Sequence, residues 1–100
     1  MNNKHLITLS EAQEMTHAFQ NSSQFQNLTK ACMIDKNAYQ QVIDQPGCVG
    51  LRTYFALNSS QMLTIVVVGV DENGNDLTSG IILNKSDDCP TFCANNSLLM

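Results

Sequence analysis

The segment from Asp71 to Asp76 carries the strongest local folding signal in the chain. It reads Asp-Glu-Asn-Gly-Asn-Asp and lies between two stretches rich in aliphatic and β-branched residues, 62–70 and 77–83. An Asn-Gly pair favours a two-residue type I′ turn, in which both central residues have positive φ and the flanking strands form a hairpin. A third stretch of this kind, 48–57, precedes the other two and is separated from them by the polar residues 58–61. The sequence therefore predicts a three-stranded antiparallel meander with 62–70 as its middle strand.

Two helices are predicted before these strands. Thr8 and Glu11 have the spacing of a capping box, and apolar residues recur at helical spacing after them, which predicts a helix at about 9–20. Asp35 is a favourable N-cap for a second helix at about 36–44, where four apolar residues form a stripe. A Pro-Gly pair ends the second helix, because proline lacks a backbone N–H and disfavours helical geometry in the residue before it.

The two turns also predict the strand register. A two-residue loop at Asn73-Gly74 places Val70 opposite Leu77. A two-residue loop at Ser59-Ser60 gives a register for the first hairpin that places the same middle-strand residues on the apolar face. One face then collects the apolar side chains of Val49, Leu51, Phe55, Leu57, Val66, Val68, Val70, Leu77, Ile81 and Leu83. We expect both helices to pack on this face, so that residues 1–100 form a single α+β domain of order ααβββ.

The opposite face of the predicted sheet is part apolar and part small. It carries Cys48, Gly50, Arg52, Tyr54, Ile65, Val67, Gly69, Thr78, Gly80 and Ile82. Two helices cannot cover both sides of a sheet, so either the C-terminal tail or another subunit must cover this one. Only 14% of the residues are charged, against about 25% in typical domains, and a weakly charged surface resists self-association poorly. We therefore expect a homo-oligomer, in the simplest case a dimer. The candidate interaction face consists of Arg52, Tyr54, Ile65, Val67, Thr78 and Ile82.

Arg52 and Tyr54 are the polar residues of this face on which a binding site would depend. They lie two apart on one predicted strand, where a guanidinium beside a phenol could bind a carboxylate or a phosphate by paired hydrogen bonds. The alternative is a structural surface or dimer contact, with Arg52 stacked on Tyr54. We favour the structural interpretation, because one charged residue rarely makes a small-molecule site.

The four cysteines are the remaining chemical candidates. Cys89 and Cys93 form a C-x3-C loop, whereas Cys32 and Cys48 stand alone. Tetrahedral zinc usually takes its ligands as two close pairs, and only one such pair is present. The alternatives are a structural metal site, a reversible bridge between Cys89 and Cys93, and packing of reduced thiols. A catalytic thiolate is disfavoured, because no histidine lies near these cysteines in sequence.

Charge and motif content exclude several classes of function. A net charge of −4 with pI near 4.7, and five scattered basic residues, argue against nucleic acid as a partner. No apolar stretch approaches the ~20 residues of a membrane helix, and the N-terminus lacks the apolar region of a signal peptide, so we expect a cytoplasmic protein. There is no nucleotide-binding loop, zinc-protease motif or nucleophile elbow. We expect a protein that is not an enzyme.

Three segments form a combined pattern in this chain: Gln45–Arg52, Val68–Asp76 and Cys89–Cys93. With this pattern, nearly the whole chain resembles a group of short, uncharacterised bacterial proteins. The resemblance implies a small cytosolic protein, and it implies that Cys48 belongs to the pattern of the group together with the C-x3-C pair. The leading hypothesis is a non-enzymatic domain that self-associates or binds a protein partner. The alternative is a structural metal or thiol redox site formed by Cys89, Cys93 and Cys48, with zinc as the candidate metal.

Overall fold

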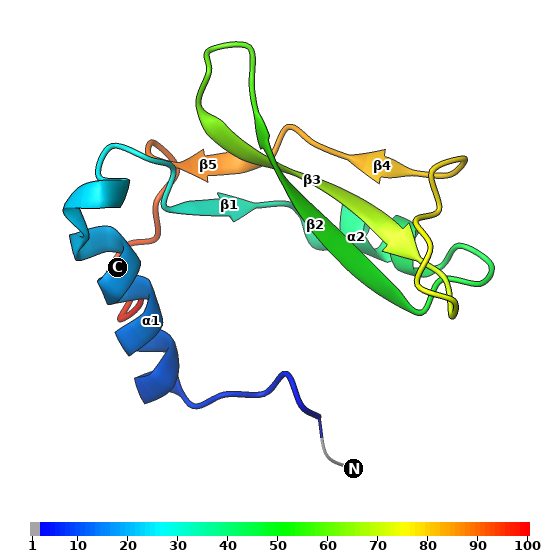
Figure 1. The fold of residues 1–100 in the computed structure, drawn as a ribbon, viewed down its shortest axis with the longest axis horizontal. Helices are drawn as coiled ribbons and strands as arrows, with labels where there is room; N and C mark the ends of the chain where they lie inside the picture. Colours follow the sequence, from blue (N-terminus) through cyan, green and yellow to red (C-terminus); the bar gives the residue numbers. More distant parts are fainter. Residues whose placement is uncertain (1–2) are drawn as a thin grey trace. The chain divides into compact units, whose positions relative to one another are not determined.

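The computed structural model describes residues 3–100, and the chain divides into two compact units (Figure 1). The first unit contains the described residues up to Leu28 together with Cys93–Met100, and the second contains Thr29–Phe92. Helices and antiparallel sheets are both present, so the α+β class is confirmed. That the whole chain forms a single domain stays a prediction.

The first unit is built on helix α1, Leu9–Asn21. Its N-terminus has the predicted capping box: Glu11 N donates to the Thr8 hydroxyl at 3.1 Å, and Thr8 N donates to the Glu11 carboxylate at 3.2 Å. The short 3-10 helix η1, Ser23–Phe25, follows, and its phenylalanine stacks on Phe19 with ring centroids 5.2 Å apart. A local sequence signal therefore accounts for the start of α1.

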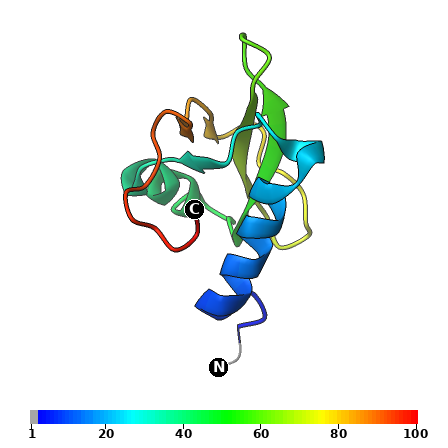
Figure 2. The same cartoon turned by 90° about the vertical axis from the view of Figure 1, so that its left-hand side faces the viewer.

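The second unit contains helix α2, Lys36–Ile43, and five strands. The strands form one three-stranded sheet, ordered β2 (Gly50–Leu57), β3 (Leu63–Val70) and β4 (Ile82–Leu83), and one two-stranded sheet of β1 (Ala31–Met33) with β5 (Asp87–Cys89). Strands β1 and β5 were not predicted. Asp35 is the N-cap of α2, as expected, and its carboxylate accepts a hydrogen bond from Ala38 N at 2.8 Å. Strands β2 and β3 form one long hairpin whose loop projects beyond the other strands (Figures 1 and 2).

The register predicted for this hairpin is wrong by one residue. Gly50 pairs with Val70 and Leu57 with Leu63, because the loop is five residues long and not two. Asn58 organises this loop: Asn58 N donates to Met62 O at 2.9 Å, and the Asn58 side chain accepts hydrogen bonds from two loop N–H groups. A side-chain hydrogen bond of this kind competes with the tight turn assumed from the sequence.

The turn after β3 also differs from the predicted type I′ geometry. Gly74 has φ +84°, whereas Asn73 keeps a negative φ, and Gly74 N donates to Asp71 O at 3.0 Å. These features define a type I turn followed by a left-handed glycine, which makes a three-residue loop instead of a two-residue one. Val70 therefore bridges Asp76 and not Leu77.

The predicted third strand, 77–83, is reduced to the two residues of β4. Leu77 N still donates to Gly69 O at 2.8 Å, but the next pair in the ladder is Val68 with Ile82, so residues 78–81 loop out of the sheet. The Gln45 side chain supports this excursion by accepting a hydrogen bond from the backbone N–H of residue 81 at 2.8 Å. Gly80 lies so close to the Gln45 amide that a Cβ there would collide with it, so a larger residue would require the Gln45 side chain to move.

The core of the second unit lies in the middle of β3. Val67 is 0% exposed and Val68 is 3% exposed, although they point to opposite faces of the sheet. On the Val67 side, α2 packs against β2 and β3 and contributes the fully buried Val42 (Figure 1). Of the two helices expected on the sheet, α2 packs on it, and α1 belongs to the other unit. Phe55, predicted to lie beneath the helices, is 80% exposed.

Candidate functional site

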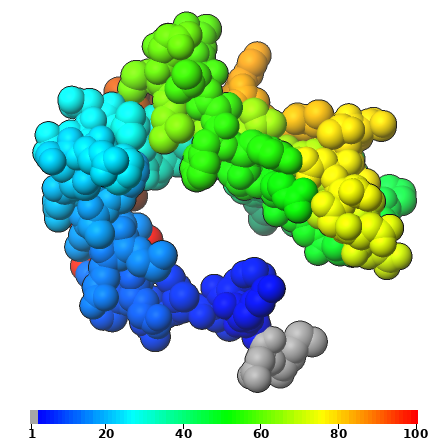
Figure 3. Space-filling view, viewed as in Figure 1, coloured from blue at the N-terminus to red at the C-terminus, as the bar shows by residue number. Residues whose placement is uncertain are grey.

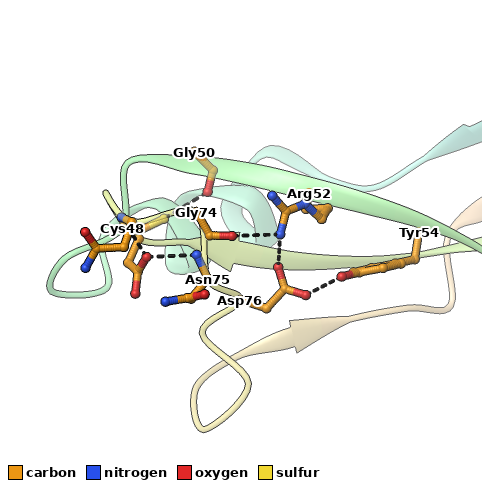
Figure 4. A network of polar contacts seen from close by, with 9 residues as sticks. Cys48, Gly50, Arg52, Tyr54, Gly74, Asn75 and Asp76 are labelled. Atoms are coloured by element: carbon orange, nitrogen blue, oxygen red, sulfur yellow. Dashed lines mark hydrogen bonds and ion pairs between the residues drawn. The ribbon is translucent and has the colours of Figure 1, made fainter.

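Arg52, Tyr54 and Asp76 form the best-defined polar cluster of the second unit (Figure 4). The Asp76 carboxylate lies between the other two side chains: Arg52 Nη1 is 2.5 Å from Asp76 Oδ1, and the Tyr54 hydroxyl donates to Asp76 Oδ2. Arg52 Nη1 also donates to Gly74 O at 3.2 Å. One carboxylate thus accepts from both strand residues, and the arginine ties the strand to the glycine turn.

The strand register places Asp76 within reach. Val70 pairs with Gly50 on one side and bridges Asp76 on the other, so the Asp76 carboxylate reaches across β3 to β2. Arg52 lies directly opposite Val68, which is buried beneath this cluster's face of the sheet. The cluster therefore fastens the turn after β3 to the edge strand β2.

The three groups shift one another's proton affinities. The hydrogen bond from Tyr54, and then the charge and hydrogen bond of Arg52, lower the pKa of the Asp76 carboxyl. In return, Asp76 raises the pKa of the Arg52 guanidinium and that of the Tyr54 phenol. At neutral pH the cluster is a carboxylate held by a guanidinium and a neutral phenol.

Arg52 and Tyr54 do bind a carboxylate in this structure, as their spacing suggested they could. The carboxylate that they bind belongs to the same chain, which favours the structural interpretation of the pair. Asp76 was not among the predicted site residues, because a two-residue hairpin loop would place it at an exposed tip. A glycine in the third loop position was the available signal, since a type I turn with a left-handed glycine is the usual three-residue hairpin loop.

A surface cleft of ≈ 390 Å³ adjoins Asp76. Its lining residues are Gln45, Pro46, Asp76, Leu77, Thr78, Ser79 and Gly80. Gln45 uses both ends of its amide inside the protein, donating to Val42 O at 3.0 Å and accepting from the residue 81 N–H. The polar groups of Gln45 and Asp76 are therefore already paired, so the cleft offers a ligand mainly the hydroxyls of its outer loop.

The six residues of the predicted interaction face do not share one face. Arg52, Tyr54 and Ile82 lie on the same side of the sheet as Val68, whereas Ile65 and Val67 point to the other side. Val67 is fully buried, and Thr78 lies in the loop that leaves the sheet. The one-residue change in register separates the set.

A different surface is exposed along β2. This strand is at the end of the sheet order β2-β3-β4, and within residues 3–100 no further strand pairs with it. Exposed apolar side chains line it: Phe55 is 80% exposed and Leu57 is 64% exposed, with Leu51 and the adjoining Val49 also exposed. The green atoms of β2 lie at the surface in the space-filling view (Figure 3). The sequence pattern predicts these side chains in the core, and this prediction is wrong.

The cysteines fall into two chemical states. Cys89 and Cys93 are disulfide-bonded, whereas Cys32 and Cys48 are free thiols. The Cys48 Sγ donates to Gly50 O at 3.2 Å. In the part of the chain that the structure describes, no three His, Cys, Asp or Glu side chains form a group that could hold a metal ion. The weak metal candidates Cys48, Cys89 and Cys93 are therefore not gathered into such a group.

Cys32 belongs to a second polar cluster, between the two sheets. Cys32 pairs with Asp88 across β1 and β5, and burial followed by the hydrogen bond to Asp88 raises the pKa of its thiol. Ser86 donates to Asp88 and lies 3.3 Å from the hydroxyl of the buried Thr64 on β3. A raised pKa keeps the thiol protonated, so this arrangement joins the two sheets and does not activate a nucleophile.

Comparisons of the chain with protein-family models, with curated proteins and with solved structures found no match. Among the helices of residues 3–100, none combines the length and the apolar character needed to cross a membrane.

Proposed function

We propose that the chain is a non-enzymatic module that self-associates or binds an extended partner segment through the open edge of β2. The observation that carries this proposal is an eight-residue edge strand lined by exposed apolar side chains. Natural proteins usually protect such edges with charges, prolines, bulges or short strands, because an open edge is a template for pairing with another chain.

The two edges of the sheet differ in this respect. The opposite edge is β4, which has two residues, whereas β2 has eight and contains no proline and a single charged residue, Arg52. Asp76 holds the side chain of Arg52 over the sheet face, so this charge does not project along the edge. Edge-strand pairing gives affinity through main-chain hydrogen bonds and specificity through alternate side chains.

A proline at Thr53 tests the proposal. Hydrogen-bonded pairs recur every second residue in an antiparallel ladder, and Asn58 N donates to Met62 O, so the even-numbered residues of β2 face β3 with their main-chain groups. The N–H of Thr53 then points to the open edge, where proline is tolerated within the fold but blocks pairing. Sedimentation velocity should show association of the wild type and of Thr53→Val, and a monomer for Thr53→Pro.

Circular dichroism of the three proteins checks that Thr53→Pro still folds. Should Thr53→Pro lose its fold, Thr53→Lys provides the second variant, because a charge on the edge also opposes pairing. A wild type that remains monomeric at its highest soluble concentration, and that binds no extended peptide, would overturn the proposal.

A second proposal is thiol chemistry at Cys89 and Cys93. The disulfide-bonded form of both residues supports the thiol version over the metal version, because a disulfide sulfur is not a thiolate ligand. Titration of thiols in the unfolded protein should find two free thiols before reduction and four afterwards. Four free thiols before reduction, or zinc retained in stoichiometric amount, would contradict it.

A further inference from the structure

The open edge of β2 has a self-complementary pattern of side chains. We propose that its partner is a second copy of this chain, paired antiparallel to it with the twofold axis at Thr53. This inference rests on the proposed function and adds the identity of the partner and the register of the pairing.

The edge itself restricts the register. Leu51, Thr53, Phe55 and Leu57 direct their N–H and C=O groups to the open edge, because the even-numbered residues are bonded to β3. In a twofold antiparallel pair, residue i lies opposite residue j of the copy with a constant sum i + j. A twofold axis at a residue makes this sum even, so edge-facing residues meet edge-facing residues.

The register centred on Thr53 matches apolar side chains on one face. Leu51 then lies opposite Phe55 of the second copy, and Thr53 lies opposite Thr53. Leu51 and Phe55 are both exposed in the single chain. Each of these two side chains gains an apolar cross-strand neighbour, and such pairs stabilise sheets. Val49 lies outside this ladder, because its N–H already donates to Val70 O at 2.8 Å. No polar side chain on this face meets an apolar one.

The opposite face is matched by charge and shape. In this register Arg52 lies opposite Tyr54 of the second copy, and Gly50 lies opposite Ala56. The guanidinium can stack on the phenol ring of the copy, and the Asp76 carboxylate of each chain already holds both side chains over this face. Gly50 and Ala56 are both small, so their side chains do not obstruct the approach of the two strands. The internal cluster thus orients the side chains that the copy would contact.

The neighbouring registers fit less well. Centring the pair on Arg52 places two guanidinium groups opposite each other, and like charges so placed destabilise a strand pair. Centring it on Tyr54 places the polar Thr53 opposite the apolar Phe55. The register centred on Thr53 is therefore the one that pairs apolar side chains with each other on one face and a guanidinium with a phenol on the other.

Cysteine cross-linking distinguishes these registers. Directly opposite residues of an edge-facing pair have Cα atoms about 5.5 Å apart, within the range that a disulfide spans. Thr53→Cys should therefore form a disulfide-linked dimer with itself when oxidised glutathione accepts the two electrons and two protons of the thiols. Leu51→Cys alone should not, because Leu51 lies four residues away from its own copy along the strand. An equal mixture of Leu51→Cys and Phe55→Cys should link one variant to the other.

Peptide mass spectrometry identifies the linked residues, so the native thiols can be kept. A dimer in which Thr53→Cys links instead to Phe55→Cys, or Leu51→Cys to Leu57→Cys, would overturn the register while leaving the proposed function intact. A dimer in which none of these edge residues link would overturn the pairing of two copies through β2. A protein that stays monomeric in sedimentation but binds an extended peptide at this edge would overturn the second copy as the partner.

Discussion

Strands β2 and β3 have the same length and are both rich in apolar residues, yet they have opposite environments. Val67 of β3 is fully buried, whereas Phe55 of β2 is 80% exposed, although the two strands pair along all eight residues. β3 is the middle strand, with α2 against one face and the Arg52 cluster over the other. β2 is an edge strand. Apolar character therefore identifies strands in this chain, but the position in the sheet decides which strand forms the core and which is available for contact.

The largest expected effect separates these two strands directly. Val67→Ala should lower the free energy of unfolding by about 2–3 kcal/mol, because it removes buried methyl groups and leaves a cavity in the core. Phe55→Ala should change it by only about 0.5 kcal/mol or less in the monomer, because the ring is exposed. Urea unfolding at low protein concentration measures both, and equal losses would remove the distinction between core and edge.

A smaller effect is expected where β3 loses its regular pairing on the β4 side. Gln45→Ala should cost about 1–2 kcal/mol, because it leaves the residue 81 N–H and the Val42 carbonyl without their side-chain partner. Gln40→Ala is the matched control, since Gln40 makes an exposed hydrogen bond to Asp44 at 2.8 Å and should contribute less. Thermal unfolding compares them, and an equal loss in both variants would show that Gln45 does not support the loop.

The smallest effect concerns the cluster that ties β2 to the turn after β3, and it depends on pH. The lowered pKa of Asp76 means that its contribution to stability is present above the pKa of the unfolded chain and is lost as pH falls through the lower folded value. Asp76→Asn should therefore reduce Tm at neutral pH, and the difference from the wild type should shrink toward zero in acid.

Glu72→Gln provides the control for charge, because it removes one carboxylate from the exposed tip of the same loop. Tyr54 gives the complementary prediction at high pH. Its pKa is raised by Asp76, so its contribution is present below the pKa of the unfolded phenol and is lost as pH rises through the folded value. A Tm difference for Asp76→Asn that stays constant from neutral to acid pH would contradict the role of this carboxylate.

Local signals in the sequence were sufficient for the helices. Thr8 and Glu11 mark the start of α1, and Asp35 marks the start of α2, because capping depends on residues within one helical turn. The strands β2 and β3 were also predictable from their composition. The three-residue strands β1 and β5 were not, because so short a pair is stabilised by its partners and carries no clear pattern of its own.

The candidate site depended on information that lies outside the strands. Arg52 and Tyr54 were recognised as a pair from their spacing, but their partner Asp76 followed only from the length of the loop after β3. A two-residue and a three-residue loop differ by a single residue, and that difference reverses which side chains share a face.

The sequence by itself determined the helix starts, the two long strands and the positions of the turns, since each depends on residues that are close along the chain. The tertiary structure alone decided the strand register, the burial of β3 and the open edge of β2. Asn58 lengthens one loop through hydrogen bonds inside that loop, and Gln45 holds the 78–81 excursion from 36 residues away, so side-chain hydrogen bonds selected among registers with similar strand propensities. The register of two strands depends on contacts between them, so it cannot be read from the sequence of either strand alone.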